Sequence, residues 1–143
     1  MLNYLGDTLY AGPLEFQGRD PEIFRNSPEK SVLRSVRYDY KWLNSDANFL
    51  LSFEYEAFVY FIFRESAVEF MNCGRTVYSR IARVCKNDTG GFREGIWTTY
   101  LKARLNCSMP GQPGQFPFYF DEIQDVTFTE GDDIIYGIFA TAE

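Results

Sequence analysis

The stretch WTTYLKARLNCSMP, residues 97–110, decides the fold together with RIARVCKNDTGG, residues 80–91. In the first stretch, mostly apolar positions alternate with mostly polar ones. The apolar side holds Trp97, Thr99, Leu101, Ala103, Leu105 and Cys107. A period of two is typical of a half-buried strand, and we predict a strand over 97–107. A helix is the alternative, because Trp97, Leu101 and Leu105 also share one helical face.

Three further strands are predicted just before this one, at Phe49–Tyr55, Phe58–Phe63 and Thr76–Cys85. The run Phe58–Phe63 is apolar throughout, as in a strand that is buried on both faces. The connection Lys86–Gly95 is rich in Gly, Asn and Asp and is predicted to be a loop. Residues 49–108 are therefore expected to form one unit of four strands.

A loose repeat suggests that similar units lie on both sides. An apolar residue followed by Tyr recurs at Leu9-Tyr10, Val59-Tyr60 and Ile135-Tyr136. The repeat predicts the same strand in successive sheets, and coincidence in a Tyr-rich chain is the alternative. The flanking strands are expected at Thr8–Phe16, around Glu22–Arg25, at Ser31–Tyr38, at Tyr119–Phe128 and at Ile134–Ala140, with a loop at Pro110–Gly114.

Composition limits the classes of function. The chain has 143 residues and a formal net charge of −6, with 45% hydrophobic and 18% aromatic residues. This length suits one domain with a real core. The acidic balance leaves no basic stripe for nucleic acid. No apolar run approaches the about 20 residues needed to span a bilayer, and Met1–Asp7 does not look like a signal peptide.

Three cysteines and no histidine argue against a metal centre and against nucleophilic catalysis. An odd number of cysteines leaves at least one without a partner in this chain. Three widely spaced thiolates make a poor zinc site, and the usual general base for Ser or Cys is absent. We therefore expect no metal, no cofactor, no catalytic residue and no small-molecule substrate.

Carboxylates offer only weak signals for catalysis. The triplet Asp88-Thr89-Gly90 matches that of aspartic proteases, in which paired carboxylates activate water, but no second copy exists. The pair Asp121-Glu122 and the run Glu130–Asp133 could belong to a glycosidase or a calcium site. Exposed loop charge is the better interpretation of both.

Two triplets fit the acceptor pattern for N-glycosylation, Asn106-Cys107-Ser108 and Asn87-Asp88-Thr89. Asn106 is favoured, because it lies on the predicted solvent side of its strand. Asn87 is the weaker candidate, because an acidic middle residue is poorly accepted.

These residues also carry a family resemblance. The matching segments are residues 77–88 (VYSRIARVCKND), 90–91, 97–108, 18–21, 41–44, 59–65, 116–120 and 135–139. Together they resemble the Sema domain of semaphorins over nearly the whole chain. The invertebrate transmembrane kind and the thrombospondin-repeat kind are nearest, since Cys73 in Asn72-Cys73-Gly74 is a feature associated with them.

The resemblance implies an all-β fold, as a fragment of a seven-bladed propeller with antiparallel four-stranded blades. Residues 1–48 would end one blade, 49–108 would form one complete blade, and 109–143 would begin the next. An unclosed set of blades exposes apolar faces and strand edges. We therefore expect the isolated chain to be unstable or to aggregate.

The resemblance also gives the cysteines a role. The family's cysteines at the positions of Cys85 and Cys107 pair with cysteines farther along the domain, beyond residue 143. A bridge between Cys73 and Cys85 within one hairpin would compete with that pairing. The alternative, from the residues alone, is a buried free thiol.

The function implied is that of an extracellular guidance cue, secreted or the ectodomain of a single-pass membrane protein. Semaphorins bind plexin-type receptors through the propeller, act in axon guidance and cell migration, and usually work as homodimers. A receptor-side Sema domain, as in plexins, is one alternative, and a sialidase-type propeller enzyme is a weaker one. The enzyme would need clustered arginines, whereas Arg80 and Arg83 are expected on opposite faces of their strand.

Overall fold

The structure, a computed structural model, describes residues 2–12, 21–70 and 74–141. The first sheet holds β1 (Leu2–Leu5), β2 (Thr8–Ala11), β3 (Phe24–Asn26) and β4 (Leu33–Arg34). The second holds β5 (Asn48–Tyr55), β6 (Phe58–Ser66), β7 (Val77–Cys85) and β8 (Leu101–Arg104), with the 3₁₀ turn η1 (Val68–Phe70) between β6 and β7. Two hairpins follow, β9 (Ser108–Met109) with β10 (Phe118–Tyr119), and β11 (Glu122–Thr129) with β12 (Ile134–Ala140).

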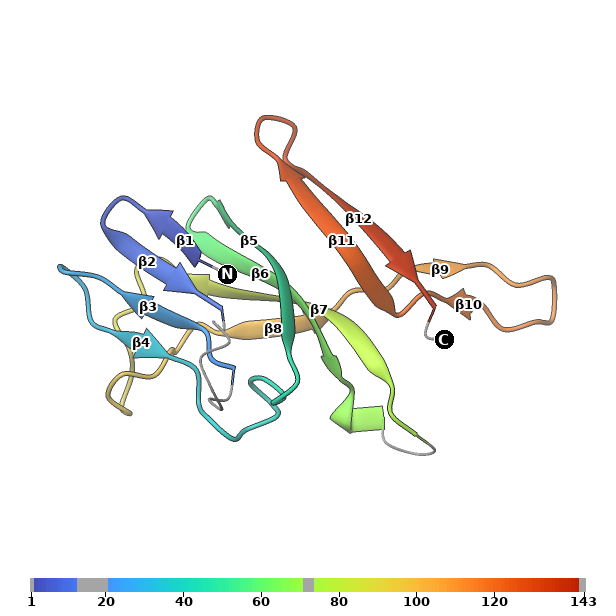
Figure 1. The fold of residues 1–143 in the computed structure, drawn as a ribbon, viewed down its shortest axis with the longest axis horizontal. Coiled ribbons are helices and arrows are strands. Elements are labelled where there is room, and N and C mark those ends of the chain that lie inside the picture. Colours follow the sequence, from blue (N-terminus) through green and yellow to red (C-terminus); the bar gives the residue numbers. More distant parts are fainter. Residues whose placement is uncertain (1, 13–20, 71–73, 142–143) are drawn as a thin grey trace.

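Both four-stranded sheets are antiparallel, and neighbours in sequence are neighbours in the sheet. Figure 1 shows the two sheets lying against each other, with the β11–β12 hairpin crossing the other side of the second sheet and the β9–β10 hairpin projecting away. The prediction of an all-β fold with antiparallel four-stranded sheets is confirmed.

The middle sheet is buried on both faces near β6, and alternation along the strand explains how. Val59, Phe61 and Phe63 point toward the first sheet and join its core, which includes Tyr10, Ile23, Leu33 and Trp97. Ile62 points the other way and packs with Phe53, Ile123 and Val126. Because apolar residues occupy both parities of β6, this strand separates two apolar cores.

The predicted strand over 97–107 is confirmed only for residues 101–104, and it is wrong for the four residues before them and the three after them. Only Leu101–Arg104 pairs with β7, and no helix forms there. Trp97 is instead inserted between the first two sheets, where its indole Nε1 donates to the carbonyl of Ile23 at 2.9 Å. Leu101 is 55% exposed on the opposite face of the second sheet, so Trp97 and Leu101 do not share the inward side that alternation suggested.

Other boundaries differ in smaller ways. The first sheet has an additional strand, β1, that the sequence pattern did not indicate. Its remaining strands are shorter than predicted, and residues 13–16 of the predicted Thr8–Phe16 strand lie outside the described residues. The strand at Ile134–Ala140 is confirmed at both ends, as β12.

One part of the second sheet carries apolar side chains without a covering layer. The strand β11 packs against β5, β6 and β7, but it does not reach the outer end of the sheet. There a hollow of about 290 Å³ is lined by Tyr60, Ile81, Ala82, Arg83, Leu101 and Ala103. The first sheet has four strands to cover its neighbour, whereas the β11–β12 sheet has two.

Candidate interaction surface

Two connections between strands lie along one edge of the two large sheets. Residues 35–47 join β4 to β5, and η1 begins the connection from β6 to β7. Figure 1 places both along the lower edge of the sheets. We call residues 36–45 the tyrosine loop, because Tyr38 and Tyr40 project from it with 91% and 55% of their surface exposed.

A buried carboxylate holds the base of this loop. Glu65, at the end of β6, is 2% exposed. Its Oε1 accepts from Lys102 Nζ at 2.6 Å and from Arg80 Nε at 3.2 Å. Its Oε2 accepts from the backbone N–H of Asn44 at 2.8 Å. One carboxylate thereby joins β6, β7 and β8 to the loop, and hydrogen bonds to a buried charge are stronger than neutral ones.

Further contacts fix the loop from below. The Tyr100 hydroxyl donates to the carbonyl of Trp42 at 2.5 Å, and the two rings stack with centroids 4.7 Å apart. Lys102 Nζ also donates to the carbonyl of Tyr40 at 3.2 Å. Burial, with the nearby charge of Glu65, raises the pKa of Tyr100, so its hydroxyl remains a donor.

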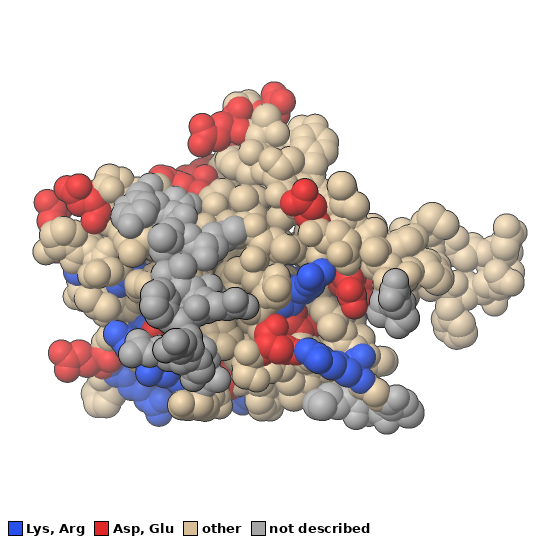
Figure 2. Space-filling view, in the orientation of Figure 1, with Lys and Arg blue, Asp and Glu red and all other residues tan. Residues whose placement is uncertain are grey.

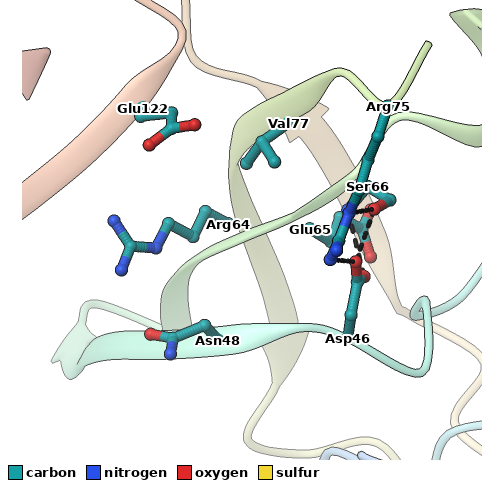
Figure 3. A pocket seen from close by; sticks show the side chains of 8 residues that line it. All are labelled: Asp46, Asn48, Arg64, Glu65, Ser66, Arg75, Val77 and Glu122. Atoms are coloured by element: carbon teal, nitrogen blue, oxygen red, sulfur yellow. Dashed lines mark hydrogen bonds and ion pairs between the residues drawn. The ribbon is translucent and has the colours of Figure 1, made fainter. Parts of the chain in front are cut away.

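Beside the loop lies a polar pocket of about 210 Å³ lined by Asp46, Asn48, Arg64, Glu65, Ser66, Arg75, Val77 and Glu122. Asp46 accepts from the Ser66 backbone N–H at 3.0 Å and from Arg75 Nη2 at 2.5 Å. Burial opposes ionisation of Asp46, but the hydrogen bonds from Ser66 and Arg75 outweigh it and lower its pKa. Figure 3 shows Arg64 pointing away from this trio, between Asn48 and Glu122. The charges of the residues that line the pocket thus largely compensate one another.

The outward side of the tyrosine loop differs from its base, because the exposed side chains of Tyr38 and Tyr40 make no hydrogen bond to a described residue. Tyr38 has a backbone φ of 57°, which a bulky residue rarely adopts and which costs about 1–3 kcal/mol. Next to it is a groove of about 250 Å³ lined by Pro21, Tyr38, Tyr40, Leu43, Asn44 and Ser45. Such a combination of rigid backbone and exposed aromatic rings suits binding to a protein surface.

Two of the three cysteines lie in the described part of the chain, Cys85 at the end of β7 and Cys107 just before β9. Cys85 pairs with Phe58 in the β6–β7 ladder and has the same strand parity as Ile81 and Arg83. Cys107 precedes β9 and is half-buried, and both of these thiols are free. Cys73 lies outside the described residues, so a bridge from Cys73 to Cys85 is untested.

Both predicted acceptor asparagines are accessible. Asn87 is exposed in the turn that ends β7, and Asn106 is exposed between β8 and β9. Thr89 and Ser108, the hydroxyl residues of the two triplets, are exposed as well.

Asp88 has a structural place in the fold. It is 4% exposed, and its carboxylate accepts backbone N–H groups of Gly90, Thr98 and Thr99 at 2.8–2.9 Å, with both threonine hydroxyls at 2.6–2.8 Å. Burial opposes ionisation, but these hydrogen bonds prevail and lower its pKa to about 2. The carboxylate therefore braces the loop between β7 and β8, which explains the Asp-Thr-Gly triplet without catalysis.

Arg80 and Arg83 do lie on opposite faces of β7. Arg80 contacts Glu65, and the guanidinium of Arg83 lies 4.4 Å from the ring centroid of Phe58. In the described part of the chain, no group of His, Cys, Asp and Glu is arranged to hold a metal ion.

Sequence reasoning missed Glu65 and its partners. A signal was available, because Arg64-Glu65 ends an otherwise apolar strand and a charge at such a place needs a partner. The partners could not be predicted from the sequence, since Asn44, Arg80 and Lys102 come from three other segments.

Comparison with known proteins adds the family. A scan against protein-family profiles finds no match. Human Semaphorin-5A is 51% identical over 139 residues, and Semaphorin 5c of Drosophila melanogaster is 47% identical over 147 residues. These alignments cover 95% and 99% of this chain but 12% and 13% of the relatives.

Solved structures agree with the sequences. Drosophila Semaphorin 2a superposes with a TM-score of 0.82 at 47% identity, covering 95% of this chain and 23% of that one. By sequence and by fold, the chain is a partial Sema domain of the semaphorin family. A structure described as Drosophila Plexin A in complex with Semaphorin 1b matches with a TM-score of 0.82 at 44% identity, over 99% of this chain and 27% of that one. Within its described residues, this semaphorin segment has no helix long and apolar enough to cross a membrane.

Proposed function

We propose that this chain is part of an extracellular semaphorin-type guidance cue that binds a plexin-type receptor through its Sema domain. The observation that carries the proposal is the match to Semaphorin 1b in a complex with Plexin A, over 99% of this chain. The candidate surface supports the same class of function, since it offers exposed aromatic side chains on a braced loop. Affinity would come from buried surface.

We further propose that the chain comprises the end of one blade (1–48), a complete blade (49–108) and the first half of the next (109–143). The support is the two-stranded β11–β12 sheet beside the uncovered face of the second sheet. Two more strands next to β12 would cover Ile81, Leu101 and Ala103, as the first sheet covers the other face.

We also propose roles for the cysteines and the acceptor asparagines. Cys85 lies on the side that the completed blade would cover, so we propose that Cys85 and Cys107 form disulfides with cysteines beyond residue 143. Each bridge would stabilise the domain by about 2–4 kcal/mol. Asn106 and Asn87 are proposed glycosylation sites, and the whole protein is proposed to be a homodimer.

The test uses the complete ectodomain that carries this chain, expressed by secretion as a tagged protein. It should bind cells that display a plexin-type receptor and not matched cells without one. Binding that does not depend on any receptor of this type would overturn the proposal. Peptide mapping of the same protein, with and without glycosidase and reductant, checks the asparagines and the cysteines.

A further inference from the structure

We propose that Asn106 receives its glycan only while Cys107 is still a free thiol, so that the redox state of Cys107 decides whether the neighbouring asparagine is glycosylated. The inference rests on the proposed function, which places the chain in the secretory pathway, where disulfides form. It adds the order of two modifications on adjacent residues. Three observations on the acceptor triplet carry it.

The first observation is that the folded chain holds the acceptor triplet, residues 106–108, from both sides. Just before it, the N–H group of Leu105 donates to a carbonyl of β7 at 2.8 Å. Within it, the carbonyl of Cys107 accepts from the N–H group of Phe120 at 2.9 Å, and Ser108 pairs with β10. The transferase must bind the asparagine amide together with the hydroxyl two residues later. A triplet tied to two neighbouring strands is not free to enter such a site, so glycosylation precedes the final fold.

The second observation is that the β9–β10 hairpin by itself holds the triplet weakly. The two strands share only two residue pairs, and glycine and proline are frequent in the connection between them. A two-stranded hairpin alone is marginally stable at best in water. Pairing of β9 with β10 therefore opens and closes repeatedly on the unfinished chain, and the triplet stays accessible until another bond holds it closed.

The third observation is that Cys107, the middle residue of the triplet, can supply that bond. Its thiol is half-buried and free of any bridge to the described residues. The Cα atoms of a disulfide lie about 4.4–6.8 Å apart, and neighbouring Cα atoms along the chain about 3.8 Å, so the partner's backbone would lie within about 11 Å of Asn106 Cα. A second chain segment at that distance obstructs an enzyme that has to surround the triplet. Oxidation of Cys107 therefore closes the acceptor site.

The opposite order creates no conflict. Asn106 and Ser108 are exposed in the folded chain, whereas Cys107 between them is half-buried. A glycan on Asn106 can project into solvent while the thiol of Cys107 reaches its partner. Glycan first and disulfide second gives the complete product, whereas disulfide first gives a folded chain that stays without this glycan.

The two steps draw on different reagents. In the first, Asn106 Nδ2 bonds to the anomeric carbon of an oligosaccharide carried on a lipid diphosphate; the bond from that carbon to the diphosphate oxygen breaks, and Nδ2 loses one proton. In the second, the thiols of Cys107 and its partner lose two protons and two electrons to the disulfide of a secretory-pathway oxidoreductase, which becomes a dithiol. Because neither step consumes the product of the other, their order depends on which reaction reaches the triplet first.

The test expresses the complete ectodomain in secreting cells during a pulse of diamide, a thiol oxidant that hastens disulfide formation. Peptide mapping reads both modifications on one peptide, because Asn106 and Cys107 are adjacent. In the parent protein, diamide should lower the glycosylated fraction of Asn106 at least about twofold, since more triplets are oxidised first. Dithiothreitol in place of diamide should not lower that fraction.

The decisive variant is Cys107→Ser, which keeps an acceptor triplet and removes its thiol. Glycosylation of Asn106 in this variant should not respond to diamide. The readout does not require the variant to fold, because the transferase acts on the unfolded chain. Cys85→Ser is the matched control: it also removes one thiol of a proposed bridge, but one that lies outside the triplet. Its Asn106 should respond to diamide as the parent protein does.

The outcomes separate the inference from the proposal beneath it. No fall in the parent protein, or an equal fall in Cys107→Ser, would overturn the inference. A chain that carries the Cys107 disulfide without the glycan, and gains the glycan during a later chase, would overturn it as well. If Asn106 is unmodified in both proteins while the ectodomain is secreted and binds a plexin-type receptor, only the inference is overturned. If the secreted ectodomain binds no such receptor, the proposed function is overturned, and the diamide comparison still decides the order of the two modifications.

Discussion

Glu65 Oε1 lies 2.6 Å from Lys102 Nζ, and both side chains are almost fully withdrawn from solvent. The same oxygen contacts Arg80 Nε at 3.2 Å, so one buried carboxylate compensates two cations. These three residues come from β6, β8 and β7, and the other oxygen of Glu65 binds the loop at Asn44. The relationship connects the interior of a sheet to the tyrosine loop at its edge.

Replacing Glu65 with Gln should destabilise the protein severely. Lys102 would lose its counter-charge in a buried site, and Arg80 would keep only its second partner, Glu69, so the expected cost is about 3–5 kcal/mol. Chemical denaturation of the complete ectodomain measures the free energy of unfolding. The double variant Glu65→Gln with Lys102→Met should recover part of the loss, because it removes the lysine charge together with the carboxylate that neutralised it. Equal stability of the parent and Glu65→Gln would contradict the arrangement.

Asp88→Asn should reduce stability and alter its dependence on pH. The folded pKa of about 2 lies below the ordinary carboxyl value of 3.8, so Asp88 contributes stability above pH 3.8 that is lost as pH falls toward 2. Melting temperatures from pH 7 to pH 2 should therefore fall less steeply for Asp88→Asn than for the parent. At pH 7 the variant should lose about 1–3 kcal/mol, because an amide cannot accept all five hydrogen bonds. Equal slopes of melting temperature against pH for the two proteins would contradict the structural role of Asp88.

Trp97→Phe should weaken the contact between the first two sheets. The variant keeps most of the buried ring but loses the hydrogen bond to the Ile23 carbonyl and part of the contact with Arg25, whose guanidinium lies 5.2 Å from the ring centroid. A buried carbonyl without its donor costs about 1–3 kcal/mol. Thermal unfolding measures this, with Phe92→Leu as a control, since Phe92 is fully exposed. A loss no greater than that of the control would show that the indole N–H is not needed.

The isolated chain of 143 residues should associate with itself. It exposes Leu101 and Ile138 at 55% and 66%, and β12 has a free edge among the described strands. Exposed apolar patches and open edges promote aggregation. Light scattering after size exclusion should detect large species, and Leu101→Lys with Ile138→Lys should reduce them. A monomer that melts in one sharp transition would contradict the view that blades are missing. Figure 2 shows acidic side chains at the tip of the β11–β12 hairpin and no charged side chain on the projecting β9–β10 hairpin. The two lysine substitutions lie in strands β8 and β12, so they leave the charge of both hairpin tips unchanged.

Local pattern predicted the strands that are long and bounded by clear turns. The strands β5, β6, β7 and β12 lie within three residues of the predicted ends, because apolar and β-branched runs there stop at polar turns. The pattern failed at Trp97–Tyr100, where the Asp88 carboxylate occupies the backbone N–H groups that a strand would have used. Alternation alone could not reveal that competition, since the competing acceptor lies some ten residues earlier in the chain.

The tyrosine loop was beyond sequence reasoning for a different reason. Its residues carry no motif, and Tyr38 and Tyr40 read as ordinary members of a Tyr-rich chain. Their exposure depends on which way the loop turns, and that is decided by Glu65, Tyr100 and Lys102 beneath it.

The sequence by itself determined the fold class, the order of most strands and the semaphorin relationship, because period-two patterns and conspicuous motifs are local properties of the chain. Tertiary structure alone decided which face of the middle sheet is left uncovered, where Trp97 inserts and which loop is braced. Each of these depends on side chains from separate strands meeting around a buried group, and the free energy of such a meeting is fixed by register and burial, which no single segment contains.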